Sequence, residues 1–218
     1  KAAERLVRDY LKVHDDSTID YDLILELLKY VFSSEYGKEG SVLIFLPGWD
    51  DISKLYRIIL SIPEYNTKTF KVIQLHSGIQ KKAQQDVFQP LSHGEHKIIL
   101  STNIAETSIT IDDVTVVVDC GRMKEKTYDP YVKLAYLKST WISQANARQR
   151  KGRAGRTRAG VCFHLYSRRR HSNLQEFQDS ELLRMSLEDV LLQTKTLGFA
   201  PGKGNSPDSL QSFLLKAL

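Results

Sequence analysis

Five short, continuous apolar runs, separated by segments with helical spacing, constrain the fold of this chain more than any other feature. Runs of this length are typical of strands that are buried on both faces of a parallel sheet. The runs cover residues 41–46, 71–75, 97–101, 114–119 and 160–166. Segments with helical apolar spacing cover residues 21–32, about 50–60 and 80–88. The alternation predicts an α/β fold with a mostly parallel sheet flanked by helices.

Capping and turn residues predict where these elements begin and end. Asp20 suits the N-cap of the first helix, and Asp50 or Asp51 suits that of the second. Residues 121–139 contain an Asp-Pro turn and predict a protruding β-hairpin, although an ordinary surface hairpin is an equal alternative. Further on, residues 182–197 predict a helix with Ser186 as its cap, and a second helix follows over 209–217.

Size and composition exclude several classes of protein. A chain of 218 residues suits one α/β domain with an appendage. No apolar run approaches the roughly 20 residues of a membrane span, so no membrane partner is predicted. Cys120 and Cys162 are the only cysteines, and with six histidines they form neither a disulfide framework nor a zinc spacing. We therefore predict no metal site within the chain and a nuclear or cytoplasmic location.

Basic charge is concentrated in one acid-free block. Residues 130–175 contain no Asp or Glu but hold eleven of the 31 Lys and Arg, and the remaining twenty face 26 acidic residues elsewhere. Such a bipolar chain predicts a polyanion partner, either nucleic acid or nucleotide. For residues 168–170 alone, a solvated basic face is the better interpretation.

The segment 149–156, Gln-Arg-Lys-Gly-Arg-Ala-Gly-Arg, is the most distinctive part of that block. On a helix, Gln149, Arg153 and Arg156 would share one face, because separations of four and seven residues return to nearly the same angle. Two glycines within a helix would each cost about 1 kcal/mol relative to alanine, which is typical of a functional site. Planar guanidiniums aligned in this way suit the stabilisation of a phosphoryl group.

Small polar residues follow three of the predicted strands, at the carboxyl edge where parallel sheets bind ligands. Gly48 follows the first strand and Ser77 the second, but each is a common strand-to-helix joint when considered alone. The third strand leads into residues 102–112, which hold five hydroxyl or amide side chains and Asp112. Thr102 and Asn103 could bind a phosphodiester, and Ser108, Thr110 and Asp112 a nucleotide. A turn that caps a helix would explain only some of these groups.

The order of these motifs resembles the second RecA-like domain of the DEAH-box/RNA-helicase-A group of superfamily 2 helicases. The resemblance spans about residues 20–166 and rests on SVLIFLPGWDDI at 41–52, STNIAETSITIDD at 101–113 and QRKGRAGR at 149–156. These segments are similar to motifs IV, V and VI of that group. Glutamine at 149, where DEAD-box proteins usually carry histidine, is similar to the DEAH side.

The resemblance implies a role for each matching residue. Arg153 and Arg156 are similar to arginine fingers at the γ-phosphate, and Gln149 to the residue that orders the attacking water. On the nucleotide, Ser108 and Thr110 match positions near the γ-phosphate. Asp112 matches a position at the ribose, and Phe88 matches the aromatic residue that stacks on the base. The positions expected at the RNA backbone are Thr102, Asn103, Ser77 and Gly48.

The resemblance also implies cofactors, partners and further modules. ATP or another nucleotide, with Mg²⁺, would bind between this domain and a first RecA-like domain. Single-stranded or structured RNA would be the substrate, with DNA as an alternative. The implied division is a linker over 1–19, the RecA-like domain over 20–178, and the truncated start of a winged-helix module over 179–218. The first RecA-like domain and the C-terminal winged-helix and ratchet modules of the same protein would be its partners.

The sequence lacks a phosphate-binding Gly-x-x-x-x-Gly-Lys-[Ser/Thr] loop and an Asp-Glu-x-His string. Arginine fingers without a phosphate loop form half of an active site, so we expect the isolated chain to be inactive. Two alternatives remain: a binding module that has lost catalysis, and a nucleotide-binding enzyme of another class. The second alternative needs a glycine-rich loop after the first strand, and none is present.

Overall fold

The computed structural model describes the chain except for residues 1, 39, 79–84, 108, 200–208 and 218. The chain forms two compact units. Unit 1 comprises residues 1–123 and 141–176, and unit 2 comprises residues 124–140 and 177–218.

A five-stranded parallel sheet forms the centre of unit 1. Its order is β2-β3-β1-β4-β7, so the predicted mostly parallel α/β fold is confirmed. The strands are β1 (Ser41–Phe45), β2 (Phe70–Leu75), β3 (His96–Ser101), β4 (Val114–Asp119) and β7 (Val161–His164). All five match the predicted apolar runs to within two residues at either end.

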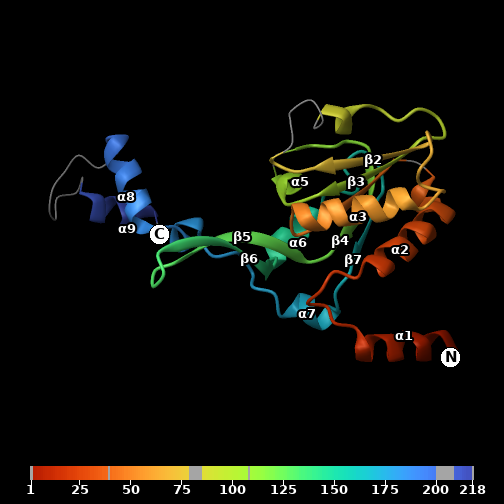
Figure 1. Cartoon of the computed structure of the whole chain (residues 1–218), viewed down its shortest axis with the longest axis horizontal. Helices are drawn as coiled ribbons and strands as arrows, with labels where there is room; N and C mark the ends of the chain where they lie inside the picture. Colours follow the sequence, from red (N-terminus) through yellow and green to blue (C-terminus); the bar gives the residue numbers. More distant parts are fainter. Residues whose placement is uncertain (1, 39, 79–84, 108, 200–208, 218) are drawn as a thin grey trace. The chain divides into compact units, whose positions relative to one another are not determined.

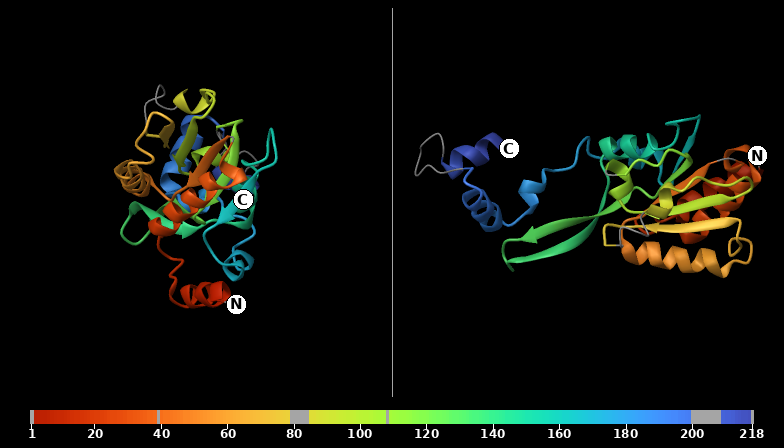
Figure 2. Two further views of the ribbon diagram at one scale, coloured as in Figure 1. Left: turned by 90° about the vertical axis from the view of Figure 1, so that its right-hand side faces the viewer. Right: turned by 90° about the horizontal axis from the view of Figure 1, so that it is seen from above.

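Helices cover both faces of this sheet (Figures 1 and 2). On one face, α2 (Tyr21–Ser33) and α3 (Trp49–Ser61) pack Ile24, Leu28 and Leu55 onto alternate residues of β1, β3 and β4. The opposite residues of the strands form a second core with Ala105 of α5 (Ile104–Thr107). The helix α6 (Gln144–Lys151) lies on that second side. Burial of the strands on both faces explains why they are continuous apolar runs.

The caps confirm one prediction and correct another. The Asp20 side chain accepts a hydrogen bond from the Leu23 amide at 2.9 Å, as expected of an N-cap. The cap of α3 is Gly48, however, and Asp50 and Asp51 lie in the first turn of the helix. Acidic residues stabilise that position through the helix dipole instead.

The structure adds one helix to the predicted elements and modifies two other expectations. A helix α1 (Ala2–Val13) occupies most of the stretch that we treated as a linker. The helix expected over 80–88 lies partly outside the described residues, and its end is the short 3₁₀ helix η2 (Asp86–Phe88).

The basic segment 168–170 is not simply solvated, because Arg170 of α7 (Arg168–Ser172) donates to both carboxylate oxygens of Asp16 at 3.0 and 3.2 Å.

The predicted hairpin is present as β5 (Arg122–Asp129) and β6 (Leu134–Trp141), which pair with each other. Its turn is held by Asp129, whose Oδ1 accepts the Tyr131 amide at 2.8 Å. The helix expected over 182–197 is interrupted, giving η3 (Glu181–Arg184) and α8 (Leu187–Thr196), and α9 (Leu210–Ala217) follows. Within the described part of the chain, no helix has the length and apolar character needed to cross a membrane.

Candidate nucleotide and nucleic-acid site

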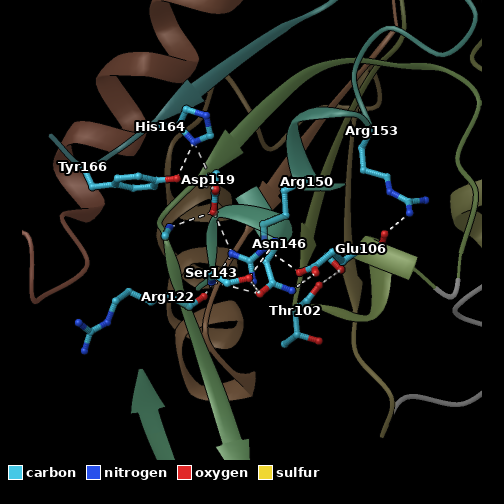
Figure 3. Close-up of polar contacts among 12 residues, drawn as sticks. Thr102, Glu106, Asp119, Arg122, Ser143, Asn146, Arg150, Arg153, His164 and Tyr166 are labelled. Carbon is cyan, nitrogen blue, oxygen red and sulfur yellow. Dashed lines mark hydrogen bonds and ion pairs between the residues drawn. The ribbon is translucent and has the colours of Figure 1, made fainter. Parts of the chain in front are cut away.

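A buried arginine connects two of the distinctive segments (Figure 3). Arg150 of α6 is fully buried, donates to Glu106 Oε2 at 3.0 Å and to Asp119 Oδ1 at 2.8 Å, and lies 4.8 Å from the Phe45 ring centre. Asn146, one turn earlier, donates to the other oxygen of Glu106 and forms a capping box with Ser143. The network therefore ties α6 to α5 and to the end of β4.

One guanidinium and two carboxylates share this network. Burial alone would raise the pKa of Asp119, but Arg150 and hydrogen bonds from His164 and the Gly121 amide hold that pKa below its ordinary value. Burial likewise opposes the charge of Arg150, but Asp119 and Glu106 raise its pKa above the usual range. Both groups are therefore charged when the protein is folded.

The lowered pKa of Asp119 predicts a specific dependence of stability on pH. A depressed folded-state pKa stabilises the fold above the unfolded-state pKa of about 3.9, and this contribution is lost as the pH falls through the folded-state value. We expect Asp119→Asn to destabilise the chain most at neutral pH, and progressively less below about pH 4. Urea denaturation of both proteins from pH 7 to pH 3 measures this difference. A constant difference across that range would contradict the predicted linkage.

Arg153 and Arg156 both contact the segment 106–110. Arg153 Nη1 donates to the Ile109 carbonyl at 3.1 Å and Nη2 donates to the Glu106 carbonyl, whereas Arg156 Nη1 donates to Thr110 Oγ1 at 3.0 Å. Burial, followed by the charge of Arg156, lowers the pKa of Arg153 from its ordinary value. Two neighbouring cations are thus brought to the polar segment that follows β3.

The arrangement of Gln149, Arg153 and Arg156 differs from the shared helical face that we expected. Gln149 lies on α6, but the helix ends at Lys151, so Arg153 and Arg156 do not share a helical face with it. Gly152 is the C-cap, and Gly155 turns the chain with a φ of 86° that favours glycine. Both glycines lie beyond the last residue of the helix, so their cost within a helix does not arise.

The remaining nucleotide candidates divide between described and undescribed residues. Thr110 and Asp112 are exposed, and the Asp112 carbonyl accepts the Thr157 hydroxyl at 2.7 Å. Phe88 is 54% exposed at the end of η2. Ser108 lies outside the described residues.

The nucleic-acid candidates lie together at the carboxyl edge of the sheet. Gly48, Ser77 and Thr102 follow the adjacent strands β1, β2 and β3. Hydrogen bonds join these ends, from the Leu46 amide to the Ser101 carbonyl at 2.8 Å and from Thr102 to Leu75 at 3.4 Å. Ser77 and Asn103 are exposed, whereas Gly48 and Thr102 are buried.

We expected all of the candidate residues at the carboxyl edge of the sheet, but the structure places some of them elsewhere. Asp112 lies two residues before β4, and the carbonyl of the intervening Asp113 accepts the amide of Ser41, the first residue of β1, at 2.7 Å. The segment 102–112 therefore runs from the carboxyl edge to the amino edge. A connection between parallel strands must cross the sheet in this way, so the candidates divide between two edges.

Sequence reasoning missed the residues that hold these segments together. Glu106, Asp119 and Arg150 form the central network, yet Arg150 had been counted only as part of a basic surface. A signal was available, because Asp119 ends a strand whose other residues are buried, and a carboxylate there needs a buried cation. Among the described residues, no group of His, Cys, Asp and Glu could hold a metal ion.

The parallel sheet and the paired arginine motifs define a RecA-like domain of the helicase type. A family model described as "Helicase conserved C-terminal domain" matches residues 21–158, so the chain belongs to this family. It shares 43% identity over 195 residues with the Arabidopsis thaliana "DExH-box ATP-dependent RNA helicase DExH6", covering 89% of this chain and 15% of that protein. Rat "ATP-dependent DNA/RNA helicase DHX36" is 44% identical over 189 residues, covering 87% and 19%, respectively.

A solved structure agrees with these relatives. The crystal structure of the Escherichia coli DExH-box NTPase HrpB matches with a TM-score of 0.71 and 29% identity, over 83% of this chain and 22% of that one. The resemblance to the DEAH-box/RNA-helicase-A group is thus confirmed. The chain spans less than a quarter of the length of each of these relatives.

Proposed function

We propose that the chain is the C-terminal motor domain of an ATP-dependent RNA helicase. The observation that carries this proposal is the docking of Arg153 and Arg156 onto the segment 106–110. Two guanidiniums beside a hydroxyl-rich segment suit the charge of a transferred phosphoryl group. The names of the relatives, one an ATP-dependent RNA helicase and the other an ATP-dependent DNA/RNA helicase, support the same assignment.

In this proposal, ATP binds between a first RecA-like domain and this one. Arg153 and Arg156 stabilise the phosphoryl group, Gln149 orients the attacking water, and Ser108 and Thr110 lie near the γ-phosphate. Asp112 faces the ribose and Phe88 stacks on the base. The first domain would supply the phosphate-binding loop and the ligands of Mg²⁺, which neutralises the phosphates.

RNA binds at the other edge of the sheet. Ser77, Thr102 and Asn103 would donate to backbone phosphates, and the end of β1 at Gly48 would let the strand approach closely. Because the segment 102–112 carries both the RNA contacts and Asp112, closure of the ATP cleft would move the RNA contacts as well. Backbone contacts allow DNA to replace RNA.

We also propose the division into a linker over 1–19, a RecA-like domain over 20–178 and the start of a winged-helix module over 179–218. The family match over 21–158 and the end of unit 1 at Glu176 support these bounds. The hairpin residues 124–140 belong to unit 2 by their contacts, so the proposed domain over 20–178 includes a hairpin that is part of the other compact unit. A nuclear or cytoplasmic location stays a prediction.

A comparison of the chain with the full-length protein tests the proposal. We expect the isolated chain to release no phosphate from ATP above background, with or without RNA, because half of the active site is missing. The full-length protein should hydrolyse ATP and be stimulated by RNA. Hydrolysis by the isolated chain would contradict the shared site, and RNA binding by a full-length protein that hydrolyses no ATP would favour the non-catalytic alternative.

A further inference from the structure

A buried lysine lies at the amino edge of the sheet, outside the Arg150 network. Lys97, the second residue of β3, is 1% exposed. Its ammonium donates to the carbonyls of Val87 and Gln89, both at 2.9 Å, and to Asp113 Oδ2 at 2.8 Å. An ammonium has three hydrogens, so these three acceptors match its full donor capacity.

Two of the three acceptors flank Phe88. The Val87 side chain is fully buried in the second core, whereas Phe88 between the two bound carbonyls is 54% exposed. Lys97 therefore holds this short segment from beneath, with the aromatic ring directed outward. Besides the ammonium, this three-residue 3₁₀ helix is held by Val87 in the second core and by hydrogen bonds from Gln89 to Asp86. Lys97 is the contact that bonds the backbone on both sides of Phe88.

The third acceptor, Asp113, lies next to Asp112, the residue proposed to face the ribose. Asp113 follows Asp112 directly, and its carbonyl is fixed by the Ser41 amide at 2.7 Å. One ammonium thus joins the segment that carries Phe88 to the segment that carries Asp112. A buried ammonium is unfavourable unless it is paired and fully hydrogen-bonded, so this lysine fixes the position of all three acceptors.

We propose that Lys97 is a positioning residue for nucleotide binding, which sets the base-stacking ring of Phe88 and the ribose-side carboxylate of Asp112 in one geometry. The inference rests on the proposed function, since it takes Phe88 and Asp112 as contacts of the nucleotide. Lys97 itself touches neither the phosphates nor the RNA edge. Its loss should therefore weaken the binding of only those ligands that carry a base and a ribose.

The test uses Lys97→Met in the full-length protein, with Lys71→Met as the matched control. Lys71 lies beside Lys97 in register on β2 but pairs with Glu95 at 2.7 Å. We expect Lys97→Met to raise the KM for ATP and the Kd for ADP about tenfold, which corresponds to about 1.4 kcal/mol. The kcat, the RNA affinity and the Kd for inorganic tripolyphosphate should stay within about twofold, because none of these depends on the base and ribose contacts.

Further variants separate positioning from general damage to the fold. Lys97→Arg keeps a charge but cannot meet three acceptors with the geometry of an ammonium, so it should show a smaller shift in the same direction. If Phe88→Ala raises the KM for ATP, adding Lys97→Met should raise it by less than tenfold again, because the part of the Lys97 effect that passes through Phe88 is already lost.

Distinct results would overturn the inference and the proposed function. If Phe88→Ala raises the KM for ATP while both Lys97 variants leave it within about twofold, Lys97 does not position the nucleotide. Equal losses of ATP and tripolyphosphate affinity would indicate a merely structural lysine. If Phe88→Ala itself has no effect, the proposed base contact is wrong and the role of Lys97 fails with it.

Discussion

Replacing Arg153 with alanine in the full-length protein is expected to slow ATP hydrolysis by roughly 10³-fold or more. Arg153 is held beside Arg156 by the carbonyls of Glu106 and Ile109, at the segment where the phosphates of ATP are proposed to lie. An arginine finger acts mainly on the charge of the transition state, so kcat should fall while RNA affinity changes little. Steady-state phosphate release and an RNA-binding titration at fixed salt measure the two quantities.

Two control variants separate this role from the structural contacts of Arg153. Arg148→Ala removes an exposed arginine that directly precedes the motif on α6, and it should leave turnover within a few-fold of the unaltered protein. Arg153→Lys keeps a cation that can still bond one carbonyl, but it cannot form the planar, two-pronged contact. It should retain most of the stability and little of the activity. Turnover of Arg153→Ala within a few-fold of the unaltered protein would exclude the arginine-finger assignment.

The strands were predictable from sequence because burial on both faces leaves a continuous apolar run. The pattern in residues 114–119 requires no knowledge of the rest of the chain, and β4 matches it from end to end. Helix ends were less predictable, since α3 begins after Gly48 and α6 ends before Gly152, and neither residue has a side chain that could mark the boundary by a hydrogen bond. Helical periodicity alone therefore extended α6 beyond Lys151.

The contacts between distant segments were the least predictable part of the candidate site. Arg150 is one of several basic residues in its segment, and nothing in the local sequence distinguishes it from its exposed neighbours. Only the fold brings Glu106 and Asp119 to it. Lys97 was likewise hidden at the start of an apolar strand. Pattern analysis identified the residues proposed to contact ligands, whereas those that hold them in place depend on tertiary pairing.

Arg150 links α6, which leads into the segment with Arg153 and Arg156, to α5 and to the end of β4. Of the substitutions considered, its removal should therefore have the largest effect on the free energy of unfolding. Arg150→Met would leave Glu106 and Asp119 buried without a cation, since both carboxylates are almost inaccessible to solvent. Breaking a buried ion pair by removing one partner typically costs about 3–5 kcal/mol. We expect a loss of this size in the free energy of unfolding, measured by urea denaturation of the chain at pH 7. Arg148→Met, on the exposed side of the same helix, should change it by less than about 0.5 kcal/mol.

A triple variant tests whether the unpaired carboxylates cause that loss. Adding Glu106→Gln and Asp119→Asn to Arg150→Met removes the charges of all three residues while preserving the shape of the two acidic side chains. Because neutral amides avoid the cost of isolated buried charges, the triple variant should be more stable at pH 7 than Arg150→Met alone. Equal or lower stability would show that Arg150 acts through packing on Phe45 rather than through its charge. In that case the link between α5, α6 and β4 would depend on shape, and the acid sensitivity expected for Asp119 should be absent as well.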